Sequence, residues 1–161
     1  MSSTRYYIIR HGLATHSTTG YGDQILTAQI LPESIPIIEK IGQYLRNIRS
    51  DYNVRSEIFR CQQTAEIITR LGQKPFITDA RLNEYNQESF EQLHDRVKSF
   101  LDEVESKNFH NVLICTHGSV ISGLENFLLN GEFLLGQEFT YPLPGQVSII
   151  QNKQKELIDF N

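Results

Sequence analysis

The chain has 161 residues, of which 39% are hydrophobic and 21% charged, and its formal net charge is −4. This size and composition predict one globular domain over residues 1–161 with a buried core. The acidic balance and the lack of a basic cluster argue against a nucleic-acid partner. No apolar run is long enough to cross a bilayer and no signal-peptide pattern opens the chain, so we expect a cytoplasmic protein without a membrane partner.

The first predicted strand is the apolar run 6–9, which ends at Arg10, His11 and Gly12. A polar loop rich in Gly and Thr follows over residues 12–24. Apolar residues then recur at helical spacing, with Pro32 in the first turn and Pro36 as a mild conflict. The residues of this helical stripe are Ile35, Ile38, Ile41, Leu45 and Ile48.

The middle of the chain predicts a second strand over Val54 to Phe59, which would carry Arg60 at its end. A helix is expected from Gln62 to Leu71, with Gly72 as its stop. Residues 75–78 are predicted to form a short strand.

The last third of the chain begins with a long amphipathic helix predicted from Phe90 to Val104. The strongly apolar strand 112–115 follows and leads into Thr116, His117 and Gly118. A helix is expected over 119–129, and strands over 147–150 and 156–160 should form a closing hairpin. This alternation of strands and helices predicts an α/β fold in which a mostly parallel sheet is covered by helices.

The two Xaa-His-Gly segments point to a phosphate site. In open α/β sheets the carboxyl ends of the strands line the ligand crevice, so His11 and His117 are expected to meet there. Arg10 and Arg60 would add two guanidinium groups that can bind phosphate oxygens in a forked geometry. With His117 they can supply the positive field that a divalent metal supplies elsewhere, so we expect activity without a metal or cofactor.

His11 is the better candidate for the nucleophile, because a neutral imidazole attacks phosphorus without a strong base. Arg10 flanks it, and Gly12 would let a ligand approach the backbone closely. The ring tautomer is expected to be set by a hydrogen bond from the other ring nitrogen to a backbone carbonyl of the same turn.

Each candidate site residue could also have a purely structural role. Arg60 could pair with Glu57 or Glu66 at the surface, and such pairs contribute little to stability. Glu84 taken alone could be a solvated carboxylate, and His117 a hydrogen-bonded residue at a strand end.

The remaining titratable and sulfur groups give no sign of a metal site. His94 and His110 are expected to face solvent, and the histidines have no His-x-His or His-Glu-x-x-His spacing. The two cysteines, Cys61 and Cys115, are too few for a disulfide framework and are expected to be small buried side chains.

Four segments in this order resemble the histidine phosphatase superfamily, the phosphoglycerate mutase-like enzymes. They are Arg10-His11-Gly12, the stretch from Arg60 to Glu66, Arg81 to Glu84, and Thr116-His117-Gly118. The resemblance implies a three-layer α/β/α sandwich and a phosphohistidine intermediate on His11. It places Glu84 as the general acid and implies that Gly12, Ser17, Gly118 and Ser119 contact the substrate. Glu88, four residues further on in the same polar segment, is a weaker candidate for the acid.

The chain also departs from the family pattern. Many relatives have an Asn where this chain has Ser17, a Pro where it has Glu57 and an Arg where it has Ser122. The Ser17 hydroxyl can still donate a hydrogen bond to a phosphate oxygen. The stretch from Glu84 to Phe90 is shorter than in mutases, so it should leave an open, wet site. We therefore expect a phosphatase rather than a mutase, acting on a small phosphorylated metabolite. A protein phosphohistidine phosphatase and a module that only binds phosphorylated ligands remain the alternatives.

Overall fold

The computed structural model describes residues 3–17 and 19–161, so Met1, Ser2 and Thr18 of the predicted domain lie outside the described residues. The described part holds a six-stranded sheet in the order β3-β2-β4-β1-β5-β6. Four strands run parallel, namely β1 (Arg5–Arg10), β2 (Tyr52–Arg55), β3 (Ile77–Thr78) and β4 (Asn111–Thr116). β5 (Gln146–Gln151) is antiparallel to β1 and forms the predicted hairpin with β6 (Gln154–Asp159).

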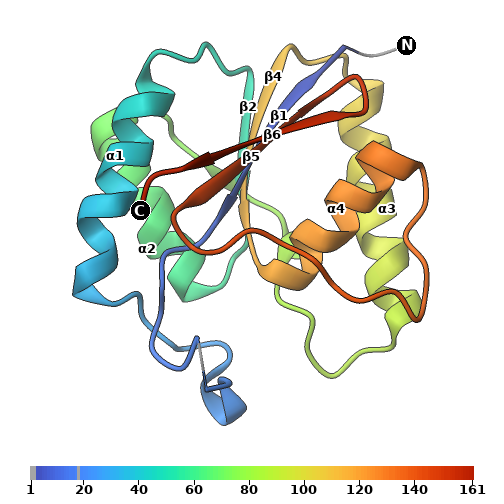
Figure 1. The fold of residues 1–161 in the computed structure, drawn as a ribbon, viewed down its shortest axis with the longest axis horizontal. Coiled ribbons are helices and arrows are strands. Elements are labelled where there is room, and N and C mark those ends of the chain that lie inside the picture. The colour runs from blue at the N-terminus through green and yellow to red at the C-terminus, as the bar shows by residue number, and fades with distance from the viewer. Residues whose placement is uncertain (1–2, 18) are drawn as a thin grey trace.

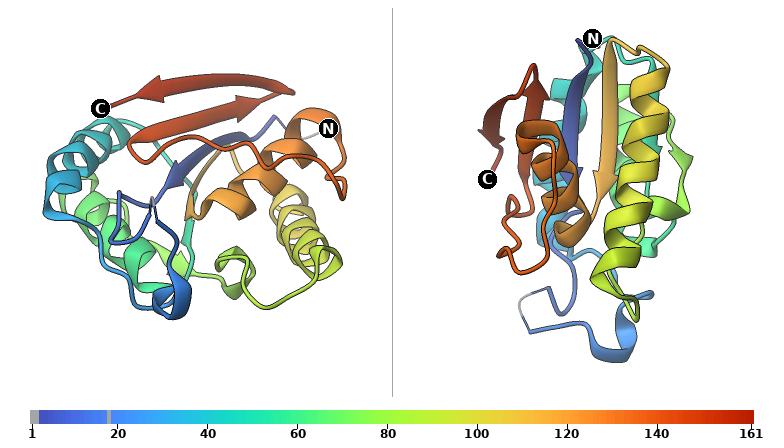
Figure 2. Two further views of the ribbon diagram at one scale, coloured as in Figure 1. Left: turned by 60° about the horizontal axis from the view of Figure 1, so that its bottom comes forward. Right: turned by 90° about the vertical axis from the view of Figure 1, so that its right-hand side faces the viewer.

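Helices cover both faces of this sheet, as Figures 1 and 2 show. One layer consists of α1 (Ile35–Arg46) and α2 (Phe59–Gly72), and the other of α3 (Phe90–Ser106) and α4 (Gly118–Asn130). Short 3-10 helices lie at Gly22–Gln24, Pro32–Ser34 and Ala80–Leu82. The three-layer α/β/α architecture with a mostly parallel sheet is thus confirmed. None of the described helices is long and apolar enough to span a membrane.

The central strand β1 contributes side chains to two hydrophobic cores, because successive side chains point to opposite faces of the sheet. Tyr6 and Ile8 pack in the core with α3 and α4. Tyr7 and Ile9 pack in the other core, with α1 and α2. Burial on both sides explains why the run 6–9 is continuously apolar.

The prediction for the second strand was wrong in its bounds. β2 ends at Arg55, and α2 already begins at Phe59, so Arg60 lies in the first turn of a helix rather than at a strand end. The hydroxyl of Ser56 accepts a hydrogen bond from the Ile58 N–H at 3.1 Å, which helps to turn the chain into the helix. Ile58 and Phe59 have the composition of a strand, but this turn takes them out of the sheet.

Gly72 is not the stop that the sequence predicted. It is the last residue of α2, and the left-handed residue that ends the helix is Gln73, with φ 56°. A Cβ on Gly72 would lie 2.7 Å from the carbonyl oxygen of Gly42 in α1. The glycine therefore allows α1 and α2 to pack closely.

The other predicted elements lie close to their expected positions. Pro32 opens a 3-10 turn that leads into α1, while Ile48 follows the end of that helix. The strand predicted over 75–78 is shortened to Ile77–Thr78. α3 begins with a capping box in which Ser89 and Gln92 satisfy each other's backbone N–H groups.

Candidate functional site

His11 and His117 lie side by side at the carboxyl ends of the two central parallel strands. Arg10 of β1 pairs in register with Thr116 of β4, and the His11 N–H donates to the Thr116 carbonyl at 3.2 Å. The two imidazole rings are 5.2 Å apart between centroids, and both side chains are buried. The structure thus brings the two predicted histidines together at one edge of the sheet.

Two hydrogen bonds fix the tautomer of the His11 ring. Nδ1 lies 2.8 Å from the Gly12 carbonyl oxygen, which can only accept, so Nδ1 carries the proton. Arg60 donates from Nε to Nε2 of His11 at 3.2 Å, so Nε2 presents its lone pair. Burial, and after it the positive charge of Arg60, lower the pKa of His11 to about 3. The imidazole is therefore neutral at pH 7, and the predicted carbonyl contact is confirmed.

Arg60 contacts both His11 and Glu84 and so joins the side chains of the site into one cluster. Its side chain is fully buried, and Nη2 forms an ion pair with Oε2 of Glu84 at 3.0 Å. Nη1 donates to the Ile25 carbonyl, and the guanidinium carbon lies 4.1 Å from the centre of the Tyr21 ring. Arg60 thus connects the His11 ring, the segment after β3 and the loop after β1. Its ion pair is with Glu84 instead of Glu57 or Glu66.

Glu84 joins this cluster, whereas Glu88 does not. The Glu84 side chain is only 12% exposed, and its Oε2 lies 3.5 Å from Nδ1 of His117. Glu88 instead accepts two hydrogen bonds from Nε of Arg96, both at 3.1 Å. Glu84 is therefore not the solvated carboxylate that its sequence position alone would allow.

A polar network behind His117 begins at Asn83, whose amide has one possible orientation. Oδ1 accepts from the backbone N–H of Glu57 at 2.9 Å, while Nδ2 donates to the Glu57 carboxylate at 3.0 Å. The Ser56 hydroxyl, 3.0 Å from Oδ1 of Asn83, must therefore donate its proton there.

The Ser56 hydroxyl in turn fixes the tautomer of His117. Because its proton is committed to Asn83, its oxygen can only accept from Nε2 of His117, which lies 2.9 Å away. Nε2 therefore carries the ring proton and Nδ1 faces Glu84. Burial and then the proximity of His11, Arg60 and Arg10 lower the pKa of His117 well below its usual value.

Arg10 lies at the edge of the cluster. Its Nη1 donates to the Pro142 carbonyl at 3.3 Å, and its guanidinium carbon lies 5.0 Å from the centre of the Tyr141 ring. Its positive charge nevertheless contributes to the lowered pKa of both His11 and His117. Arg10 thus lies near both histidines, while its contact with the same anion stays a prediction.

The two glycines of the Xaa-His-Gly segments are required by packing. A Cβ on Gly12 would lie 2.6 Å from Cδ1 of Ile38, and the Gly12 N–H is already bonded to Oγ1 of Thr64 at 2.9 Å. A Cβ on Gly118 would lie 2.8 Å from the Tyr141 ring. The structure thus gives both glycines a packing role that the sequence did not indicate, while their substrate contacts stay predictions.

The two predicted serines differ in their surroundings. The Ser17 hydroxyl accepts from the Ala14 N–H at 2.9 Å and lies 3.1 Å from the Tyr21 hydroxyl. Ser119 is half-buried in the first turn of α4. Contact of either serine with a substrate is still a prediction.

Sequence reasoning missed Ser56, Asn83 and Tyr21. Ser56 and Asn83 lie within four residues of Arg60 and Glu84, which was the available signal. Short polar residues are common in turns for other reasons, however, so this signal is weak. Nothing in the sequence indicates that Tyr21 stacks on Arg60.

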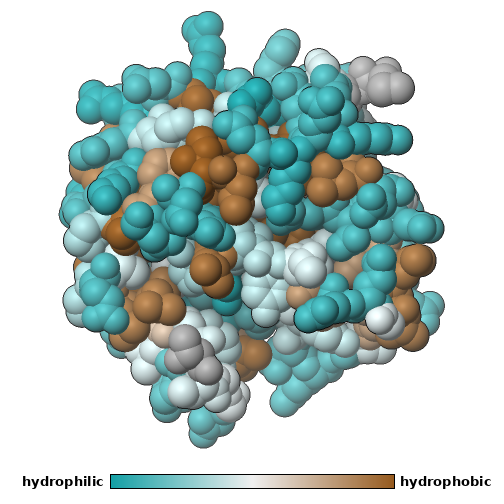
Figure 3. All heavy atoms as spheres, viewed as in Figure 1, coloured by the Kyte–Doolittle hydropathy of each residue, from teal (hydrophilic) through white to brown (hydrophobic). Residues whose placement is uncertain are grey.

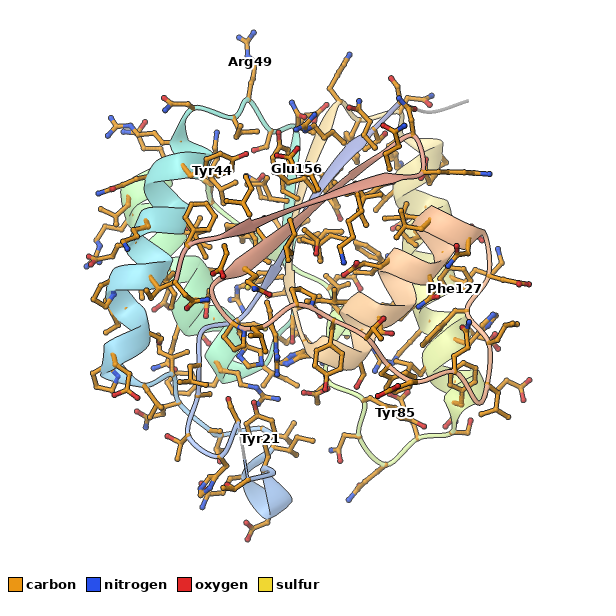
Figure 4. All side chains as sticks on the ribbon, viewed as in Figure 1. Tyr21, Tyr44, Arg49, Tyr85, Phe127 and Glu156 are labelled. Carbon is orange, nitrogen blue, oxygen red and sulfur yellow. The ribbon has the colours of Figure 1, made fainter. Side chains whose placement is uncertain are left out.

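The surroundings of the cluster are suited to an anion. α2 and α4 both begin at this edge of the sheet, and helix N-termini carry partial positive charge. Tyr21 and Tyr85 flank the same edge at the bottom of Figure 4, and the space-filling view is notched between these two segments (Figure 3). Within residues 3–17 and 19–161, no three His, Cys, Asp or Glu side chains are grouped so that they could hold a metal ion.

The predictions for the other histidines and for the two cysteines were mostly correct. His110 is exposed, but His94 is half-buried between Phe90 and Phe127 rather than fully in solvent. Cys61 and Cys115 are free and buried, as expected.

Comparisons with known structures give the same fold. A proposed alpha-ribazole-5'-P phosphatase from Escherichia coli superposes with a TM-score of 0.76 at 19% identity, covering 98% of this chain and 96% of that one. Phosphoglycerate mutase from Bacillus anthracis gives 0.71 at 16% identity, with 99% and 95% covered. The protein histidine phosphatase SixA, complexed with tungstate, gives 0.71 at 13% identity, with 96% and 94% covered.

Sequence comparison identifies the family. A search of curated proteins found no match. The family model of the histidine phosphatase superfamily (branch 1), by contrast, matches residues 6–87 and 85–157, which together span nearly the whole chain. This chain is therefore a member of the histidine phosphatase superfamily.

Proposed function

We propose that this protein is a phosphomonoester hydrolase, acting as one catalytic domain over residues 1–161, in which Nε2 of His11 accepts the phosphoryl group. The observation that carries the proposal is the double constraint on the His11 ring. Nδ1–H donates a hydrogen bond to the Gly12 carbonyl, and Nε2 accepts one from Nε of Arg60. A neutral imidazole held in this tautomer needs no further activation to attack phosphorus.

The reaction has two steps. In the first, a bond forms between Nε2 of His11 and phosphorus while the bond from phosphorus to the leaving oxygen breaks, and Glu84, after its carboxylate has taken up a proton from solvent, gives that proton to the leaving oxygen. In the second, water attacks phosphorus, Glu84 takes a proton from the water, and the bond from phosphorus to Nε2 breaks. The products are the alcohol, inorganic phosphate and the free imidazole.

Arg60 supports both reacting groups, because it donates to His11 and to Glu84. In the proposed complex the phosphoryl oxygens accept hydrogen bonds from these N–H groups, from those of Arg10 and from Nδ1 of His117 in its protonated form. This field stabilises the charge on the equatorial oxygens in the transition state, so we expect the activity to be independent of metal ions and cofactors.

The segment after Glu84 favours a phosphatase over a mutase. Only residues 85–89 separate Glu84 from α3, so this segment adds no long insertion over the site. The side chains of His11, Arg60 and His117 are nevertheless buried, so the site is less open than the short segment predicts. A site without a long insertion is poorly suited to retain a bisphosphate intermediate while it reorients. We propose small phosphorylated metabolites as the first class of substrate and the cytoplasm as the location.

A second candidate function is that of a protein phosphohistidine phosphatase. Two observations favour it: the structural similarity to the protein histidine phosphatase SixA over 96% of this chain, and the short segment after Glu84. A site of this kind can admit a phosphorylated side chain of another protein. The retained acid Glu84 still favours alkyl esters, whose alkoxide leaving group needs a proton more than imidazole does.

The test measures hydrolysis of 4-nitrophenyl phosphate in the presence of a chelator. We expect turnover by the wild type and by His110→Ala, a control at an exposed histidine, but not by His11→Ala. A wild-type rate equal to that of His11→Ala would contradict both enzyme functions and would mean that the protein only binds phosphorylated ligands. Faster turnover of a phosphohistidine peptide than of every metabolite phosphate in a panel would instead favour the second candidate.

A further inference from the structure

A cavity of about 450 Å³ includes Arg10, which directly precedes His11, in its lining. Arg10 and Ser17 line it together with the apolar side chains of Leu13, Leu143 and Pro144. This volume is within the range of sites that hold small molecules and far exceeds what a phosphate group alone requires. The cavity can therefore accommodate the part of a substrate that is not phosphate.

Arg10 connects the cavity to the proposed phosphate site. It directly precedes His11, and its charge acts on both His11 and His117. Its guanidinium is held by the Pro142 carbonyl and the Tyr141 ring, both in the segment that continues to Leu143. A phosphoryl group bound by Arg10 would therefore have the cavity next to it.

The apolar side of the cavity includes a leucine whose side chain is largely exposed to solvent. Leu143 is 62% exposed, although its backbone N–H is fixed by Oε1 of Gln146 at 2.9 Å. Leu13 and Pro144 continue the same wall. An apolar group bound there would remove Leu143 from water, which is favourable in proportion to the area buried.

The charges around the cavity disfavour a second anion. Asp159 lines the cavity, and its Oδ1 accepts from both the backbone N–H and the amide of Asn161, at 3.0 Å and 2.9 Å. These hydrogen bonds lower the pKa of Asp159, so it is ionised at pH 7. Arg10 is the one Lys, Arg or His side chain among the described lining residues. A second phosphate or a carboxylate would thus face a negative charge with no cation left to neutralise it.

We propose that this cavity binds the leaving group, and that the substrate is a phosphomonoester of an uncharged, apolar alcohol. The inference rests on the proposed function and narrows it, because it disfavours bisphosphates and phosphorylated carboxylic acids.

The test compares kcat/KM for three esters of similar leaving-group chemistry: ethyl phosphate, n-hexyl phosphate and 5-carboxypentyl phosphate. We expect hexyl phosphate to exceed ethyl phosphate by at least about tenfold, because its additional methylenes are buried. The carboxypentyl ester has nearly the same chain with a terminal charge, and it should fall at least about tenfold below the hexyl ester. Asp159→Asn should reduce the difference in kcat/KM between the hexyl and the carboxypentyl ester.

A matched pair of leucine variants localises the effect. Leu143→Asp should lower kcat/KM for hexyl phosphate about tenfold more than for ethyl phosphate. Leu135→Asp, at a leucine of the same segment that is 78% exposed and outside the cavity lining, should change neither. Equal effects of the two variants would overturn the assignment of the cavity.

Two outcomes separate this inference from the proposed function. Turnover of all three esters at equal kcat/KM would overturn the inference and leave the phosphatase intact. Turnover of none would overturn the phosphatase, and calorimetric binding of the same esters to the His11→Ala variant then decides the inference. Tighter binding of the hexyl ester than of the other two supports it, and equal binding or no binding overturns it.

Discussion

The two histidine-bearing turns have nearly the same sequence pattern, yet they hold their rings in opposite tautomers. Each follows a central strand and precedes a glycine, and the two rings lie 5.2 Å apart. His11 donates from Nδ1 to its own turn, whereas His117 donates from Nε2 to Ser56, which belongs to the segment after β2. The position of the acceptor for the ring N–H, more than the motif, therefore decides which nitrogen carries the proton and which carries the lone pair.

This contrast is the basis for the proposed division of labour. His11 offers a lone pair at Nε2 next to Arg60, as a nucleophile requires. His117 has its free nitrogen, Nδ1, directed at Glu84, so in its protonated form it would donate a hydrogen bond to a phosphoryl oxygen or to that carboxylate. Substitutions at the two rings and at their partners test whether His11 and His117 differ in this way.

The largest expected effect comes from truncating each ring in turn. His11→Ala removes the atom that forms the covalent bond, so we expect kcat to fall by about 10⁴-fold or more. His117→Ala removes one stabilising group, so we expect a fall of about 10²- to 10³-fold. Rapid quenching should trap an acid-labile, base-stable phosphoryl label on the wild type and on His117→Ala but not on His11→Ala. Label that persists in His11→Ala would contradict the assignment.

Glu84→Gln tests the carboxyl group that lies next to His117. Without an acid, alkyl phosphates should slow by about 10²- to 10⁴-fold, while aryl phosphates, which have better leaving groups, should slow much less. Steady-state rates for an alkyl and an aryl ester give the two ratios. Glu88→Gln is the matched control and should leave both rates close to those of the wild type. Equal slowing of both esters by Glu84→Gln would mean that Glu84 is not the acid.

Ser56→Ala sharpens the comparison, because it removes the acceptor that holds the His117 tautomer. We expect a fall in kcat of about tenfold and a change in the ¹⁵N shifts of the His117 ring, while the His11 shifts stay the same. Ser106→Ala, at an exposed serine of α3, serves as the control. Unchanged ¹⁵N shifts of His117 in Ser56→Ala would show that the hydroxyl does not set the tautomer.

The smallest expected effect is on stability at low pH. Both rings are buried with lowered pKa values, that of His11 at about 3, while the unfolded chain takes up protons near pH 6.5. The His11 contribution to stability is therefore complete above pH 6.5 and is lost as the pH falls toward 3, by up to about 1.4 kcal/mol per pH unit. The His117 contribution is lost in the same direction as the pH falls below 6.5. Urea unfolding at pH 7, 5.5 and 4 should show a shallower pH dependence for His117→Gln than for the wild type. Parallel curves would show that His117 does not contribute.

The sequence predicts the two histidine turns well, for a physical reason. The runs 6–9 and 112–115 are continuously apolar because both faces of their strands are buried, and such strands occupy the centre of a parallel sheet. Their carboxyl ends must then be neighbours. Even the backbone carbonyl at the His11 ring was foreseen, because the contact lies within a single turn.

The arginine and the second histidine were harder, because their surroundings depend on contacts between distant segments. Ile58 and Phe59 have strand-forming side chains, but the Ile58 N–H donates to Ser56 and the Ile58 carbonyl accepts from Gln62, so the chain has left the sheet. The partner of Nε2 in His117 comes from 61 residues away. No local pattern specifies such a contact, so the tautomer of His117 could not be predicted.

The spacing of the two imidazoles has a consequence for how this protein can diverge. Its main-chain part is set by hydrogen bonds between β1 and β4 and by the bond from the His11 N–H to the Thr116 carbonyl, and the ring positions are set by Arg60 and Ser56, neither of which lies in the cavity lining. Substitutions at the rim, such as those at Leu143 or Asp159, can therefore accumulate without moving the reactive nitrogens. A new preference for a ligand can evolve on an unchanged chemical framework.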